Sequence, residues 1–222
     1  MNILSIVAIP FLGTALGAAT VLLTRQSVSQ RLHNSLLGFA AGVMVAAAIW
    51  SLITPAIELS LHLGNMKWMP PAVGILLGML FLLMLDSLVP HMHPTGDSVE
   101  GPQSKLGRRP MLMLAVTLHN IPEGIAVAIP IYYATQKRGK AVRFATLSGL
   151  AEPLGGLLGY IVLRSVLTPS LLACVLAVVA GIMVYISLDE LLPTAENYGE
   201  HHIAIIGVIS GMVFMSFGLL LF

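Results

Sequence analysis

The chain has 222 residues, of which 57% are hydrophobic and only 9% are charged. An ordinary soluble domain carries roughly 25% charged residues, so this composition excludes a soluble protein and predicts one integral to a membrane. The net charge of +1, without a dense basic cluster, argues against a nucleic-acid partner. Cys174 is the single cysteine, which excludes a disulfide or a cysteine metal site within one chain.

Seven apolar stretches have about the 20 residues that a helix needs to cross a bilayer. They predict an all-α, polytopic membrane helix bundle of about seven transmembrane segments, in a single transmembrane domain over residues 1–222. The first stretch contains Pro10 and has no basic residue ahead of it, so we expect a retained helix and not a signal peptide. The stretches are residues 3–24, 34–56, 70–90, 111–134, 144–163, 171–192 and 203–222.

Residues 91–110 are the one long connector, and their turn-forming residues and mixed charge predict a flexible loop. His91 and His93 could bind metal ions at its start, although two closely spaced surface histidines more often have no such role.

Residues 119–124 read His-Asn-Ile-Pro-Glu-Gly inside the fourth apolar stretch. Ionisable side chains are costly near the centre of a membrane, so they indicate a functional site there. His119 and Glu123, four residues apart, would share one face of a helix, and Asn120 adds an oxygen nearby. The pattern predicts ligands for one metal ion. The alternative is a polar cluster that only holds helices together.

A second polar interruption runs from Ser148 to Gly156 in the fifth stretch. Pro153 directly follows Glu152 and leaves the Gly149 carbonyl without its usual donor. Two proline-broken helices, each with a glutamate near mid-membrane, are typical of the discontinuous helices that form transporter sites. The alternative is a kinked packing helix whose Glu152 bonds to a neighbouring hydroxyl.

Asp189 and Glu190 lie near the end of the sixth stretch, where a helix cap or the mouth of a pathway is favoured over a central ligand. With Met44 and Ser148 they complete the candidate pathway residues. The remaining acidic and histidine residues are predicted to be solvated helix ends: Glu58, Asp86, Glu196, Glu200, His201 and His202.

Four ordered motifs resemble the ZIP family, the zinc- and iron-regulated-transporter-like proteins, and above all its bacterial broad-specificity uptake and GufA-like branches. The resemblance covers nearly the whole chain. The motifs are residues 38–44, 119–124, 149–156 and 189–193.

The resemblance implies a transporter and not an enzyme, with divalent cations such as zinc, iron, manganese or cadmium moving into the cytoplasm. It implies that His119, Asn120, Glu123 and Glu152 bind the metal, and Met44 resembles a methionine near the family's metal entrance. Zinc is the expected cargo, with no resident cofactor. A bacterial cytoplasmic (inner) membrane is the expected location, and a homodimer is left open.

The chain departs from the family because it has one such motif and seven apolar stretches, where the family has two motifs and eight helices. Residues 108–118 resemble the approach to the family's first motif, whereas the sequence from Ile125 onward resembles the exit from its second. A deletion between two near-identical motifs would produce this join, and it would remove about one helix and one loop.

Charges in the loops bear on this departure. Seven crossings divide the Lys and Arg residues six against five, whereas one further crossing between residues 109 and 137 divides them nine against two. The second division is the bias expected of a normally oriented membrane protein. A 111–134 segment that re-enters without crossing would also make the number of crossings even. The six-to-five division of Lys and Arg could instead mean dual topology, in which copies of the chain insert in both orientations.

The sequence therefore predicts a divalent metal cation transporter that works by alternating access through a mid-membrane site. The alternative is a shortened membrane protein that does not transport and only binds metal or is inert. An intramembrane zinc hydrolase is the weakest reading, because the His-Glu-x-x-His pair of such enzymes does not occur in the chain.

Overall fold

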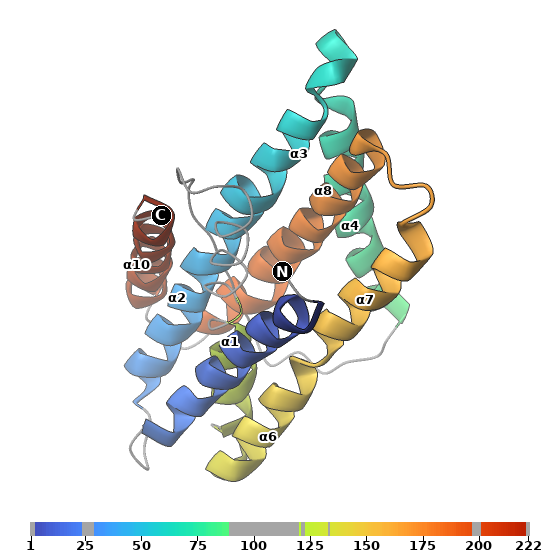
Figure 1. Cartoon of the computed structure of the whole chain (residues 1–222). Helices are drawn as coiled ribbons and strands as arrows, with labels where there is room; N and C mark the ends of the chain where they lie inside the picture. Colours follow the sequence, from blue (N-terminus) through green and yellow to red (C-terminus); the bar gives the residue numbers. More distant parts are fainter. Residues whose placement is uncertain are drawn as a thin grey trace.

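The structure is a computed structural model that describes residues 3–23, 29–88, 120, 123–132, 134–196 and 201–220. These residues form helices joined by turns, with no strand among them, which confirms the predicted all-α class. We call Glu123–Tyr132 the motif helix. The other elements (Figure 1) are α1 (Ile3–Leu23), α2 (Gln30–Ala47), η1 (Ala48–Ile53), α3 (Thr54–Leu59), η2 (Leu61–Met66), α4 (Met69–Leu88), α6 (Arg138–Ser148), α7 (Ala151–Leu163), α8 (Pro169–Ile186), η3 (Ser187–Leu191), α9 (Leu192–Glu196) and α10 (His201–Leu220).

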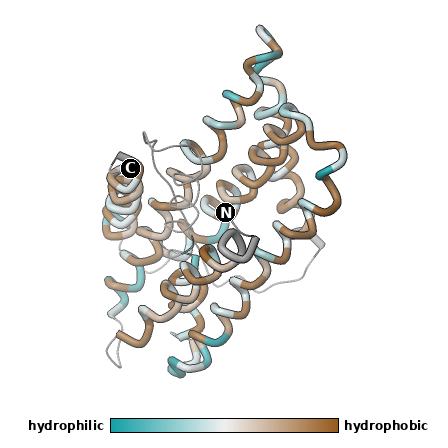
Figure 2. Tube along the Cα trace, in the orientation of Figure 1, coloured by the Kyte–Doolittle hydropathy of each residue, from teal (hydrophilic) through white to brown (hydrophobic). Residues whose placement is uncertain are grey.

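The apolar helices correspond one to one with the seven predicted stretches. Four described stretches are long and apolar enough to cross a membrane, and they are Gln30–Leu59, Arg138–Leu163, Pro169–Glu196 and His201–Leu219. Three shorter apolar helices complete the set, namely Ala8–Leu23, Met69–Leu85 and Glu123–Tyr132. Figure 2 shows hydrophobic residues along the helices and hydrophilic positions mainly near their ends. The chain is therefore an integral membrane protein.

Several described helices extend beyond the predicted apolar stretches, and two of them show why. The stretch predicted at 144–163 begins at Arg138 and is divided by a turn at Gly149 and Leu150 into α6 and α7. The stretch predicted at 34–56 extends over Gln30–Leu59. In both cases polar residues continue the helix beyond its apolar part, because a helix end that reaches water no longer needs apolar side chains.

Glycines bring α2 and α10 into backbone contact. Gly38 packs on Ala204, and Gly42 packs on Val208 and Gly211, so a methyl group at either glycine would overlap the backbone of α10. Small residues allow this close approach of membrane helices. Because residue numbers rise together along the contact, the two helices are parallel.

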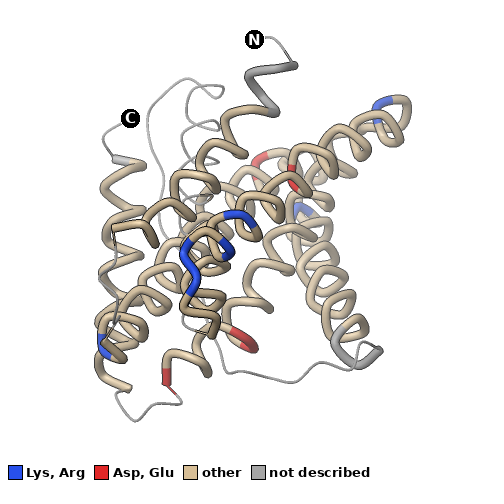
Figure 3. The backbone as a smooth tube through the Cα atoms, turned by 90° about the horizontal axis from the view of Figure 1, so that it is seen from below, with Lys and Arg blue, Asp and Glu red and all other residues tan. Residues whose placement is uncertain are grey.

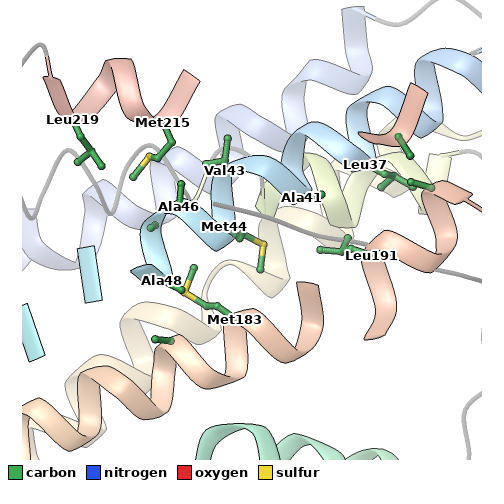
Figure 4. Packing of buried hydrophobic residues seen from close by; sticks show 14 residues of the cluster. Leu37, Ala41, Val43, Met44, Ala46, Ala48, Met183, Leu191, Met215 and Leu219 are labelled. Atoms are coloured by element: carbon green, nitrogen blue, oxygen red, sulfur yellow. The ribbon is translucent and has the colours of Figure 1, made fainter. Parts of the chain in front are cut away.

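The same arrangement joins α4 to α8. Gly74 packs on Cys174 and Gly78 on Val178, so this pair is also parallel. We call α2, α4, α8 and α10 the frame. Its buried core (Figure 4) includes Met44 from α2, Met183 from α8 and Met215 from α10.

A second group of helices, which we call the site bundle, consists of α1, the motif helix, α6 and α7. Its core is a separate cluster of small and branched apolar residues: Ala18, Val21, Ile125, Ala128, Ile129, Tyr132, Ala141 and Ala145. The two cores meet through few side chains, since Leu36 of α2 packs on the site bundle and Ala126 of the motif helix packs on the frame. The site bundle is therefore packed largely on itself.

Helix directions decide the parity of the crossings. Because α4 and α8 are parallel, and α6–α7 runs opposite to α8 (Figure 1), α6 begins on the face where α4 ends. Leu88, where α4 ends, and Arg138, where α6 begins, thus lie on the same face. This placement has the even parity that the loop charges led us to expect.

The described basic residues are divided unequally between the two faces. Arg31, the α6 cap residue Lys137 and the α6 residues Arg138, Lys140 and Arg143 belong to the face where α2 and α6 begin, whereas Lys67 and Arg164 lie in turns on the other face. Figure 3 shows the basic positions at the start of α6 gathered together. The positive-inside rule predicts that the face with five of these seven residues faces the cytoplasm.

Candidate metal site

Asn120 is fully buried and forms the centre of the candidate site. Its side-chain Nδ2 donates a hydrogen bond of 3.0 Å to Oε2 of Glu123 and another to Oε2 of Glu152. The same nitrogen donates to Oγ1 of Thr14, at 3.3 Å. One amide thus brings together two carboxylates that are 29 residues apart in the sequence.

The break between α6 and α7 positions Glu152. Pro153 has no N–H to donate to the Gly149 carbonyl, so the helix opens into a turn at Gly149 and Leu150 before α7 resumes. Glu152 falls in the first turn of α7. Its partner is the amide of Asn120, where the packing alternative had expected a hydroxyl group.

A cavity of about 330 Å³ lies beside these carboxylates. Its lining comes from the site bundle, from α2 and α8 of the frame and from η3, so residues from five separate parts of the sequence face one space. The lining residues are Thr14, Met44, Glu123, Ala126, Val127, Ser148, Gly149, Glu152, Ile186, Glu190 and Leu191. The structure therefore brings Met44, Ser148 and Glu190 to the same cavity as Glu123 and Glu152.

Two π-helical segments continue helices of the frame, η1 after α2 and η3 after α8. In η1 the Thr54 N–H bonds to the Ile49 carbonyl, and in η3 the Leu192 N–H bonds to the Ser187 carbonyl. Each segment ends two residues before a proline, Pro55 or Pro193. Single π turns commonly occur at functional sites, and η3 carries the cavity-lining Glu190.

Other sequence candidates fall elsewhere. Asp189 is exposed and does not line the cavity, whereas its neighbour Glu190 does. His119 lies outside the described residues, as do His91, His93, Glu200 and the whole 91–110 loop.

The predicted helix-end residues are largely at the surface. Glu58, His201 and His202 are exposed, and His201 Nδ1 lies 2.8 Å from the Glu196 carboxylate. These residues agree with the prediction of solvated helix ends.

Sequence reasoning missed Thr14, which is 2% exposed and bonded to Asn120. The available signal was a hydroxyl between Gly13 and Gly17 in an otherwise apolar stretch.

The donor set suits a divalent cation. Among the described residues no group of three or more His, Cys, Asp and Glu side chains is close enough to hold a metal ion. Two carboxylates nevertheless meet at Asn120, and Oδ1 of that residue is buried without a hydrogen-bond partner. Two adjacent carboxylates repel each other unless a cation or proton lies between them. Carboxylate and amide oxygens, with an imidazole from His119, would together suit zinc, iron or manganese.

Comparison with known proteins identifies the family. A family model described as the ZIP zinc transporters matches residues 101–218, more than half of the chain. A protein of Chlorobium chlorochromatii named zinc transporter ZupT is 41% identical, with 95% of this chain and 94% of the relative covered. The chain belongs to the ZIP family. A ZupT of Streptococcus mutans is 34% identical, with 97% and 95% covered.

Membership in the ZIP family confirms that the chain belongs among transporters of divalent metal cations and not among enzymes. Both matches extend over 253 residues, although this chain has only 222. Because 95–97% of this chain is matched, roughly 40 aligned positions of each relative have no counterpart in this chain. That total would be enough for one membrane helix of about 20 residues with its connections.

Proposed function

We propose that this ZIP protein carries zinc into the bacterial cytoplasm across the inner membrane, through the cavity beside Asn120. The observation that supports the proposal is the meeting of Glu123 and Glu152 at one buried amide that borders that cavity. His119 completes the proposed ligand set, and Met44, Ser148 and Glu190 are proposed to line the pathway.

The mechanism is alternating access. A hydrated cation enters the cavity and exchanges water for carboxylate oxygens, and the buried Asn120 Oδ1 atom, which has no hydrogen-bond partner, is proposed as a further ligand. The carboxylates must be ionised to bind, so cation and protons compete for the same oxygens. Rearrangement of helices around the site then opens it to the other face. The separate cores of the site bundle and the frame support such a rearrangement.

Zinc is proposed first because the curated relatives are named zinc transporters. Iron, manganese and cadmium are secondary candidates, since mixed imidazole and carboxylate ligands do not choose among these metals.

The test is zinc uptake into proteoliposomes by purified Glu123→Gln and Glu152→Gln variants. We expect each to abolish uptake, because a neutral amide cannot replace a charged oxygen ligand of a divalent cation. Glu58→Gln is the matched control, since Glu58 is exposed outside the cavity. Unchanged uptake in both site variants would overturn the assignment. Stoichiometric zinc in a wild-type protein without uptake would favour the metal-binding, non-transporting alternative.

A further inference from the structure

Helix α1 places one hydroxyl group at the metal-site cavity. Thr14 is buried and lines the cavity. Thr20, two turns further along α1, instead donates its hydroxyl to the Gly17 carbonyl of its own helix, at 2.7 Å. The two threonines thus differ in what their hydroxyl groups contact, although they share a helix.

Both ligand-bearing elements rest directly on Thr14. The motif helix approaches its backbone, because a methyl group at Gly124 would overlap the Thr14 carbonyl oxygen. The α6–α7 turn approaches its side chain, because a methyl group at Gly149 would lie 2.7 Å from Thr14 Cγ2. The Thr14 hydroxyl therefore occupies a fixed point relative to both elements.

The Asn120 amide has more acceptors than hydrogens. Nδ2 carries two hydrogens, yet Thr14 Oγ1, Glu123 Oε2 and Glu152 Oε2 are all within reach. A neutral hydroxyl held by packing takes one hydrogen and fixes the nitrogen in space. The two carboxylates then share the other hydrogen. This shared hydrogen bond holds them close enough together to bind one cation.

We propose that Thr14 is a positioning residue that sets the zinc affinity of the carboxylate pair through the Asn120 amide; this inference rests on the transport function proposed for the cavity. Thr14 does not bind the metal. Its hydroxyl orders the amide, and the amide orders the two ligands.

The test compares zinc uptake kinetics of Thr14→Val, Thr14→Ser and Thr20→Val in proteoliposomes, with Glu123→Gln as the inactive reference. Valine keeps the shape of threonine and removes only the hydroxyl, whereas serine keeps the hydroxyl and removes the methyl. We expect Thr14→Val to raise the KM for zinc about tenfold, the scale of one lost bond in a charged network, with little change in maximum rate. Thr14→Ser and Thr20→Val should retain the wild-type KM.

The outcomes separate the two proposals. If Glu123→Gln is inactive while Thr14→Val behaves like Thr20→Val, the role of Thr14 is overturned and the transport site stands. If Thr14→Val and Thr14→Ser lose uptake and melting temperature together, Thr14 acts by packing alone, and the proposal also fails. If Glu123→Gln transports normally, the transport site itself is wrong, and the positioning role is overturned with it.

Discussion

Glycine brings helices together in both the frame and the site bundle, but the side chains packed beside the glycines differ between the two regions. In the frame, Gly42 and Gly78 set whole helices backbone to backbone, and the core beside Gly42 is mainly apolar. In the site bundle, Gly124 and Gly149 both close on Thr14, beside a buried amide and two carboxylates. Close packing at glycine thus buries mainly apolar side chains in one region and holds polar side chains in register in another.

The largest expected effect comes from breaking the frame. Gly42→Leu places a side chain where the α10 backbone lies, and overpacking of this kind costs about 1–3 kcal/mol or more. We expect a loss of folded, monodisperse protein in detergent, measured by fluorescence-detected size-exclusion chromatography after heating. Gly156→Leu on α7 is the control, because no atom lies within 4 Å of a methyl group built there. Equal behaviour of the two variants would contradict the role of glycine in the frame.

A smaller effect should follow from removing the amide that joins the carboxylates. Asn120→Ala releases Glu123 and Glu152 from their shared donor, so we expect zinc uptake at low concentration to fall about tenfold or more. Asn34→Ala is the matched control, because this buried asparagine of the frame accepts from Gln30, at 3.0 Å, away from the cavity. It should lower the melting temperature and leave the KM unchanged. A similar KM change in both variants would show that the comparison between the regions is false.

The smallest perturbation tests how the site bundle faces the membrane. In a Cys174→Ala background, a cysteine at exposed Gly139 should react with a membrane-impermeant thiol reagent only from the cytoplasmic face, as should Arg31→Cys. Leu61→Cys, at the α3–α4 turn, should react only from outside. Transport should be unchanged in all three. Labelling of positions 139 and 31 from opposite faces would contradict the helix directions, which place the starts of α2 and α6 on one face.

Much of the fold follows from the sequence because membrane crossing demands long apolar stretches. The helix bounds were less certain where polar residues such as Lys140 and Gln30 continue a helix into water, since hydropathy falls there without ending the helix. The π turns of η1 and η3 could not be predicted, because the following proline is compatible with several local geometries.

The candidate site was predictable in its residues but not in its connections. Glu123 and Glu152 stood out because they are ionisable residues in apolar stretches, and an ionisable group is costly within a membrane. Which of them share a donor depends on how α1, the motif helix and α7 pack, and no spacing along the chain encodes that. Thr14 escaped notice because threonine is tolerated in a membrane helix by bonding to its own backbone, as Thr20 does.

The two glycine-packed pairs of the frame run in opposite directions, α2 and α10 one way and α4 and α8 the other. A frame of this kind has a similar outline from either side of the bilayer, so its packing does not determine the orientation in which the protein inserts. We expect the orientation to depend on a few charges, chiefly the four basic residues from Lys137 to Arg143. For the proposed transport, the direction of cation movement therefore depends on the basic start of α6, one helix away from Glu152 in α7.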